Sequence, residues 1–282
     1  MYPEVFKAKN FFKTNDFQNK LYDCVIANYF DLNNPIRFNN FAYSIRELLR
    51  EKFDYEAPDE QIKLCTWYSP LLENNEEKNK PTRSDKVRYY LAAGLNDSQL
   101  QLLQVENDIK SIQNKYLKTV NTLSKYTHIN EKNFGIDISD GDKKFREILS
   151  LIIYFLESVE ELRNRVINQI NDSVYSDINN HFFENFPPKF DLLSSHTRFS
   201  DISNLNLEIF EMTSSQIKIN GQADLEIDLQ SGTDSEVQRG DGLVWSDSYP
   251  VDFTLLVNIN DFSDIKYQFE KIDIDNFYEM EE

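Results

Sequence analysis

The sequence predicts an α+β protein, with an N-terminal helical body containing a long antiparallel helix pair, followed by a small antiparallel β-sheet domain. Apolar residues recur at helical spacing up to residue 170, and from residue 217 they alternate with polar ones. The double proline Pro187-Pro188 separates the two patterns. Charge divides the chain as well, because residues 201–282 hold nineteen Asp or Glu against four Lys or Arg and carry −15 of the net −18. We therefore expect a helical domain over residues 1–187 and an acidic antiparallel β-sheet domain over residues 188–282.

The first helices are predicted from apolar stripes. One is expected over residues 16–29 and a second over residues 39–53. The second stripe follows the spacing of a single helical face through Phe41, Ile45, Leu48, Leu49 and Phe53. Residues 87–94 predict a short helix that ends at Gly94, since glycine commonly terminates helices.

Two longer helices form the centre of the predicted helical body. The first, over residues 97–126, carries two apolar heptad rows: Leu102, Ile109, Tyr116, Leu123 and Val105, Ile112, Thr119, Tyr126. The second, over residues 143–170, carries one stripe: Phe145, Ile148, Leu149, Ile152, Leu156, Val159, Leu162, Val166 and Ile170. Each stripe needs an apolar partner, and the simplest packing is an antiparallel pair joined by residues 127–142. A second copy of the chain is the alternative partner, which would make the protein a homo-oligomer.

The β-sheet domain is predicted from alternation of apolar and polar residues. Residues 217–219 and 223–229 alternate on either side of Asn220-Gly221, a dipeptide typical of tight hairpin turns. Further strands are expected over residues 251–259 and 205–209. In the strand after the predicted turn the polar positions are acidic, so the sheet should have one apolar face and one acidic face: Asp224, Glu226 and Asp228.

Composition excludes several classes of protein. No segment approaches the roughly 20 apolar residues that a membrane-spanning helix needs, so we expect no membrane partner. The chain contains neither GxGxxG nor GxxxxGK[ST], the common phosphate-binding loops. Cys24 and Cys65 are not spaced as metal ligands, and no apolar signal segment follows the first residues. We therefore expect a cytoplasmic protein with reduced thiols.

The segment over residues 231–242 is the most unusual candidate for a site. It contains three of the seven glycines together with Asp234, Arg239 and Asp241, and charged loops on rigid scaffolds often carry function. The alternative interpretation is a simple crossover between strands. The acidic strand face offers carboxylates for a divalent metal, but residues two apart on a strand lie roughly 7 Å apart, which favours a solvated face. The sequence therefore identifies no cofactor, and a divalent metal is the one candidate.

Recognised nuclease motifs are incomplete in this sequence. DxK occurs only as Asp108-Ile-Lys110 in a predicted helix and Asp264-Ile-Lys266 after the last predicted strand. The Arg-x4–6-His motif of metal-independent helical ribonucleases is absent before each histidine. His128 nevertheless follows a predicted helix, where it acts either as a C-terminal cap or as a proton-transfer group. A small basic and aromatic patch is a second candidate, for contacts with nucleic-acid phosphates: Arg83, Lys86 and Arg88.

Short segments throughout the chain carry a resemblance to a known family. They are residues 34–48, 57–59, 81–83, 93–95, 125–129 and 232–242. Together they resemble the predicted nucleases associated with prokaryotic PIWI proteins and related bacterial defence proteins that combine helices with a sheet. The resemblance implies a role in anti-phage or anti-plasmid defence beside a protein partner encoded nearby. Six candidate residues lie in these segments: Arg46, Arg83, His128, Asp234, Arg239 and Asp241.

Three hypotheses about function follow. The first is a nuclease effector that acts on nucleic acid bound to the helical body, with Arg46, His128, Asp234, Arg239 and Asp241 as catalytic candidates. The second is a non-catalytic interaction or regulatory subunit whose acidic sheet binds a basic partner protein of the same system. The third is a self-associating toxin, suggested by the heptad rows. The sequence leaves open whether the protein is an enzyme.

Overall fold

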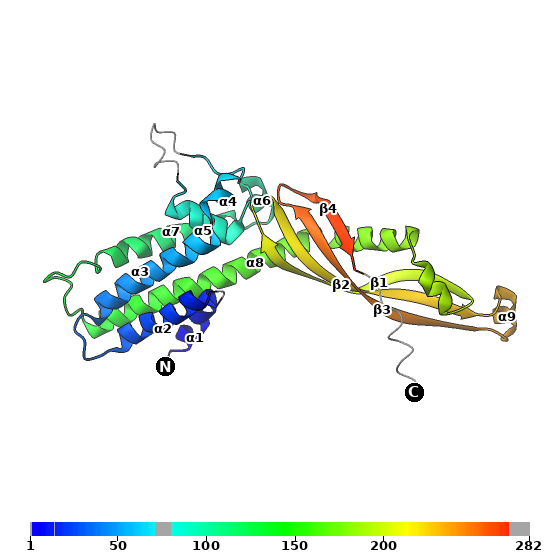
Figure 1. The fold of residues 1–282 in the computed structure, drawn as a ribbon, viewed down its shortest axis with the longest axis horizontal. Helices are drawn as coiled ribbons and strands as arrows, with labels where there is room; N and C mark the ends of the chain where they lie inside the picture. The colour runs from blue at the N-terminus through cyan, green and yellow to red at the C-terminus, as the bar shows by residue number, and fades with distance from the viewer. Residues whose placement is uncertain (1, 14, 71–79, 271–282) are drawn as a thin grey trace. The chain divides into compact units, whose positions relative to one another are not determined.

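The computed structural model describes residues 2–13, 15–70 and 80–270 and has the expected α+β architecture (Figure 1). Contacts divide the chain into two compact units, Met1–Asn164 and Arg165–Glu282. The division falls inside the long helix α8 (Ile138–Glu184), which contributes its first part to one unit and its second part to the other. The boundary expected from the sequence, at Pro187, followed the change of secondary structure. It lies about two dozen residues after the boundary between the two units that contacts define.

The first unit is helical. Before α8 the described residues form α1 (Pro3–Lys9), η1 (Asn10–Phe12), α2 (Asp16–Phe30), α3 (Arg37–Glu56), α4 (Asp59–Lys63), α5 (Arg83–Ala92), α6 (Asp97–Leu102) and α7 (Glu106–Ser124). The predicted helices over residues 16–29, 39–53 and 87–94 are confirmed as α2, α3 and α5. The short helices α1 and α4 were not predicted.

The prediction of a single helix over residues 97–126 is wrong, because the helix is interrupted between α6 and α7. Gln104 adopts a left-handed conformation, with φ of 58°, and the Val105 amide donates back to the Leu100 carbonyl oxygen. Leu102 is consequently exposed, although the heptad pattern placed it in the seam. Five of the other seam residues are buried within the chain, namely Val105, Ile109, Ile112, Tyr116 and Leu123, whereas Thr119 and Tyr126 are partly exposed.

Aromatic rings fill the core of the helical unit and join α2, α3 and α7 to α8. The Tyr29 ring stacks on Phe145 with centroids 3.9 Å apart, and Phe53 and Phe155 both contact Tyr116. The Tyr29 hydroxyl also donates to the Asp142 carboxylate at the start of α8. Burial, together with this hydrogen bond, raises the pKa of Tyr29 well above its usual range, so the phenol stays protonated.

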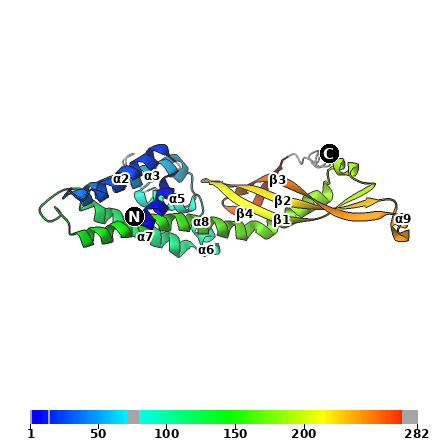
Figure 2. The ribbon, with the colours of Figure 1, turned by 90° about the horizontal axis from the view of Figure 1, so that it is seen from below.

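The second unit is an antiparallel meander of four strands covered on one face by the second part of α8 (Figures 1 and 2). In order, its elements are η3 (Pro188–Leu192), β1 (His196–Met212), β2 (Gln216–Ser231), α9 (Asp234–Arg239), β3 (Leu243–Asn258) and β4 (Asp261–Phe269). Phe182 of α8 packs against Phe199 and Phe269 of the sheet. The acidic outer face is confirmed, since Leu225 and Ile227 are buried while Asp228 is exposed.

Asn220-Gly221 does not form the predicted turn but lies inside β2, and the β1–β2 turn comes earlier, at residues 213–215. Gly221 pairs with Phe253 of β3, and the Phe253 ring lies across it. A Cβ atom at Gly221 would stand 2.0 Å from Phe253 Cε2. The glycine is therefore required by close packing on the buried face, and this packing overrides the local turn signal.

We expect Gly221→Ala to destabilise the second unit by about 2 kcal/mol, because the new methyl group must displace a buried ring. Urea unfolding of the full chain measures this. Combining it with Phe253→Leu should cost less than the sum of the two single variants, since the smaller side chain gives the methyl group room. Additive costs would contradict the packing explanation.

Asp201 of β1 holds α8 to the sheet by accepting hydrogen bonds from the Tyr175 hydroxyl (2.6 Å) and the Asn179 amide (2.9 Å). The Tyr175 hydrogen bond lowers the pKa of Asp201 below its ordinary value of 3.8. We expect Tyr175→Phe to raise this pKa and to lower stability near neutral pH, because the Asp201 carboxylate loses the hydrogen bond from the Tyr175 hydroxyl. Because a depressed carboxyl pKa stabilises the folded state above that range, the difference should vanish as pH falls below 3.8. Denaturation at several pH values tests the sign.

Candidate functional site

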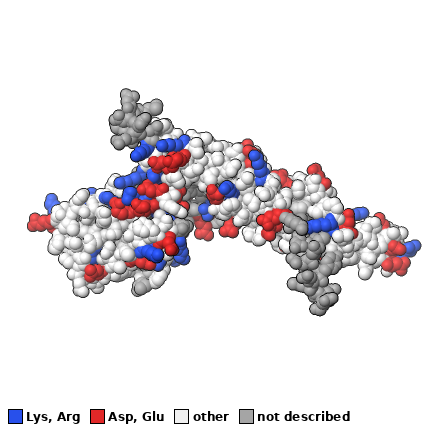
Figure 3. Space-filling view, viewed as in Figure 1, with Lys and Arg blue, Asp and Glu red and all other residues white. Residues whose placement is uncertain are grey.

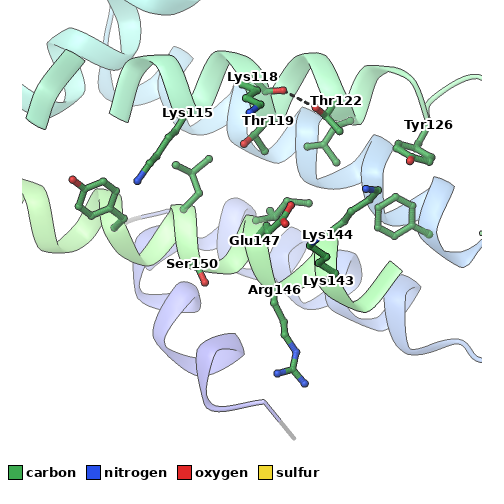
Figure 4. A pocket seen from close by; sticks show the side chains of 15 residues that line it. Lys115, Lys118, Thr119, Thr122, Tyr126, Lys143, Lys144, Arg146, Glu147 and Ser150 are labelled. Atoms are coloured by element: carbon green, nitrogen blue, oxygen red, sulfur yellow. Dashed lines mark hydrogen bonds between the residues drawn. The ribbon is translucent and has the colours of Figure 1, made fainter. Parts of the chain in front are cut away.

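A groove between α7 and α8 in the helical unit has a volume of about 720 Å³ (Figure 4). Its lining combines basic, hydroxyl-bearing and apolar side chains: Phe38, Lys115, Lys118, Thr119, Thr122, Leu123, Tyr126, Lys143, Lys144, Arg146, Glu147, Ile148, Ser150, Leu151 and Tyr154. A mainly apolar hollow of this volume with a few polar groups is typical of ligand-binding sites.

Helical spacing explains why these residues meet. On α7, Lys115, Lys118 and Thr122 recur every three or four residues and so share one face. The first turns of α8 place Lys143 and Lys144 opposite them, because the two helices run antiparallel. Phe38 of α3, together with buried apolar residues of both helices, forms the floor. We call this surface the basic groove.

The basic groove holds four lysines, Lys115, Lys118, Lys143 and Lys144, against one carboxylate, Glu147. Within the described ranges, no carboxylate oxygen lies within 4.0 Å of the amino groups of these lysines. Lys115 Nζ lies 4.7 Å from the centre of the Tyr154 ring. Arg146 points away from the groove and lies over the Tyr2 ring (Figure 4).

This arrangement suits a phosphate-bearing ligand. Ammonium groups without carboxylate partners attract phosphate oxygens, and Thr119, Thr122 and Ser150 can donate further hydrogen bonds. Tyr126 and Tyr154 present aromatic surface on which a base can stack. The described residues contain no group of three His, Cys, Asp or Glu positioned to hold a metal ion.

Two of the predicted catalytic residues lie near one end of the basic groove. Arg46 of α3 donates to Ser124 Oγ (3.4 Å) and to Glu47 (3.1 Å). Although burial alone would raise the pKa of Glu47, hydrogen bonds from Arg50 and Arg46 lower it below its usual value. His128 is exposed in the connection between α7 and α8, two residues after the groove residue Tyr126. The His128 carbonyl oxygen accepts from the Asn133 side-chain amide (2.8 Å), which fixes the backbone of this connection.

The predicted phosphate-contacting patch on α5 is largely engaged within the protein. Lys86 forms ion pairs with Asp54 (2.6 Å) and Asp59 (2.9 Å). Arg88 forms an ion pair with Asp97 (2.7 Å) and lies over the Trp67 ring. Arg83 is exposed at the start of the helix. On the face drawn in Figure 3, basic and acidic residues are likewise interspersed over the helical unit.

The other three catalytic candidates lie at the β2–β3 connection, in the second unit. Asp234 begins α9 and accepts from the Gln230 amide (2.9 Å), while exposed Arg239 and Asp241 form a loose ion pair at 3.8 Å. The glycines of this segment have structural explanations, since Gly240 caps α9 in a left-handed conformation. The structure therefore divides the five candidates between two units, with Arg46 and His128 in the other one.

No sequence motif pointed to the lysines of the basic groove. A local signal existed, because Lys143 and Lys144 are adjacent and Lys115 and Lys118 share a helical face with Thr122. Their convergence depends on the packing of α7 against α8, which no short motif records.

No helix in the described part of the chain is both long and apolar enough to cross a bilayer.

Comparison with known proteins identifies the family. A family model described as "Predicted pPIWI-associating nuclease" matches residues 10–152, and a second model with the same description matches residues 159–278. No significant match was found among curated proteins or among solved structures. The two models cover nearly the whole chain, which confirms the resemblance noted in its short segments. The chain belongs to the family of predicted pPIWI-associating nucleases.

Proposed function

We propose that this protein is a nuclease component of a bacterial anti-phage or anti-plasmid defence system, and that the basic groove binds the nucleic acid on which it acts. The observation that carries the proposal is the convergence of four lysines in one hollow, with no carboxylate partner for them among the described residues. The family description, which names nucleases associated with PIWI proteins, supports the defence setting and a partner protein of that kind.

The ligand class follows from the charge and size of the basic groove. Like-charged ammonium groups in one hollow repel one another, and a polyanion removes that repulsion while releasing its own counterions. A hollow of about 720 Å³ has room for a short stretch of a single strand. The two tyrosines on its walls suit unstacked bases.

Cleavage requires a group that moves protons beside the bound phosphodiester. We assign this role to His128, whose imidazole ring can accept and donate a proton and which follows the end of the groove at Tyr126. Arg46, which lies beside Ser124, is the candidate for stabilising charge on the phosphate. Asp234, Arg239 and Asp241 remain candidates for a second site or a partner contact, and a divalent metal remains the cofactor to test.

The second candidate function is a non-catalytic subunit that binds a basic partner. The acidic outer face of the sheet favours it, because Asp224, Glu226 and Asp228 lie opposite the buried face of β2. In that case the protein would bind its partner tightly and cleave no nucleic acid under any metal condition.

We expect the combined Lys118→Ala, Lys143→Ala and Lys144→Ala variant to bind single-stranded nucleic acid at least about tenfold more weakly. Removing three phosphate contacts should also reduce the slope of log affinity against log salt by about 2. Fluorescence anisotropy with a labelled oligonucleotide at several salt concentrations measures both quantities. Lys110→Ala is the matched control, since Lys110 lies on the same helix but pairs with Glu106. Equal losses in both variants would contradict a site in the groove.

We expect His128→Ala to abolish cleavage of labelled RNA or DNA while leaving binding within about twofold, because the group acts on chemistry and not on affinity. Substrates should be incubated with and without Mg²⁺ or Mn²⁺. His196→Ala, which alters an exposed histidine of the other unit, should retain cleavage. In cells carrying the intact defence locus, His128→Ala should also lose protection in a phage plating assay. Full protection by this variant would argue against the assigned role.

A further inference from the structure

The first part of β3 forms a sheet edge that no described strand covers. β3 pairs with β2 along residues 243–258, whereas β4 pairs with β3 only from Phe253 onwards. Among the described residues, no strand lies beside residues 243–251 on the side away from β2. Open edges invite pairing with another strand, so proteins usually shorten, charge or cover them.

The alternation of the ladder shows which backbone groups this edge offers. The Asp252 carbonyl oxygen accepts from the Glu270 amide (2.9 Å), so even-numbered residues of β3 direct their backbone away from β2. Consistently, Pro250 stands at such a position, where a missing amide hydrogen breaks no bond to β2. The Ser248 amide donates to its neighbour Asp247 (2.9 Å). Val244 and Ser246 therefore supply the amide and carbonyl groups for an incoming strand.

Exposed apolar side chains lie on the same short stretch. Leu243, Val244 and Trp245 are 70%, 57% and 41% exposed. Leu243 and Trp245 share the face of the buried Tyr249, whereas Val244 points to the outer face. Three consecutive exposed apolar residues on an unprotected edge are a liability unless another chain covers them.

The surroundings of this edge are acidic. Exposed carboxylates flank it on β2, on α9, in the connection between α9 and β3, and on β3 itself: Asp228, Asp234, Asp241 and Asp247. Arg239 is the one basic residue between Ser231 and Pro250, and it lies 3.8 Å from Asp241. Asp228 accepts from the Ser246 hydroxyl (2.7 Å), which brings a carboxylate beside the open backbone groups.

We propose that residues 243–248 of β3 form a docking edge for an extended, basic segment of a partner protein, which adds to the sheet as a further strand. Main-chain hydrogen bonds to Val244 and Ser246 would hold this segment. Its apolar side chains would cover Leu243 and Trp245 on one face, and its Lys or Arg residues would face Asp228 on the other. Charge selects this occupant over a second copy of the chain, whose own edge is equally acidic. The inference rests on the second unit alone and is independent of the basic groove.

The test uses the full chain and a ten-residue peptide of alternating Lys and Val with blocked ends. Isothermal titration calorimetry should show that it binds at least about tenfold more tightly than the same peptide with Glu in place of Lys. A version methylated on alternate backbone nitrogens should lose binding, because strand addition requires those amide hydrogens.

Two matched variants locate the edge. Ser246→Pro removes an outward amide at a position equivalent to Pro250, so the β2–β3 ladder should survive, and binding should fall at least about tenfold. Ser246→Ala keeps that amide and should bind like the unaltered chain. Circular dichroism melting of both variants confirms that they fold, and Trp245→Ala should weaken binding through its lost apolar contact.

Three outcomes would overturn the proposal. If Ser246→Pro and Ser246→Ala bind the peptide equally well, the peptide does not contact the outward backbone groups of β3. A dimer that dissociates on Trp245→Ala in sedimentation experiments would show that a second copy occupies the edge. Binding only by a chain shortened after Glu270 would show that the chain's own last residues occupy it.

Discussion

The structure depends on burial of one apolar stripe that continues along α8. In the helical unit this stripe supplies Phe145 and Phe155, on which the rings of α2, α3 and α7 converge. In the second unit it supplies Phe182, which covers the sheet. Neither unit has another element that could fill these positions within the described residues. The basic groove depends on the same helix, because Lys143 and Lys144 approach α7 only while the stripe beneath them is packed.

The sequence predicted those elements whose local pattern and tertiary packing agree. Apolar periodicity located α2, α3 and most of α8, and alternation located the acidic face of β2. Prediction failed where packing competed with local signals. Asn220-Gly221 does not form a turn, because Gly221 packs against the Phe253 ring inside the sheet. The heptad rows continue across Gln104, so they did not indicate the left-handed residue that interrupts the helix there. β4 was missed because its apolar alternation covers only Ile265, Tyr267 and Phe269, none of which is fully buried, although it forms a hairpin with β3.

The candidate site shows the same limit more strongly. Sequence patterns selected Arg46 and His128, which lie near one end of the basic groove, but passed over the lysines that line it. Those lysines come from two helices. Their importance depends on having no carboxylate partner among the residues that the structure describes, and no short motif records this property. Conversely, the composition of the glycine-rich segment over residues 232–242 predicted a functional site. Helix capping at Thr233 and Gly240 explains much of that composition.

The capped helix α9 has a consequence for engineering this protein. Thr233 and Glu236 satisfy each other's backbone amides, and Gly240 ends the helix, so α9 is capped at both ends by its own residues, with Gln230 of β2 adding a side-chain hydrogen bond to Asp234. Loop-closure cost grows slowly, by about 0.6 kcal/mol for each doubling of loop length. A short affinity tag or fluorophore-binding peptide inserted after Arg239 should therefore leave the meander intact. A label at that position would report on the second unit.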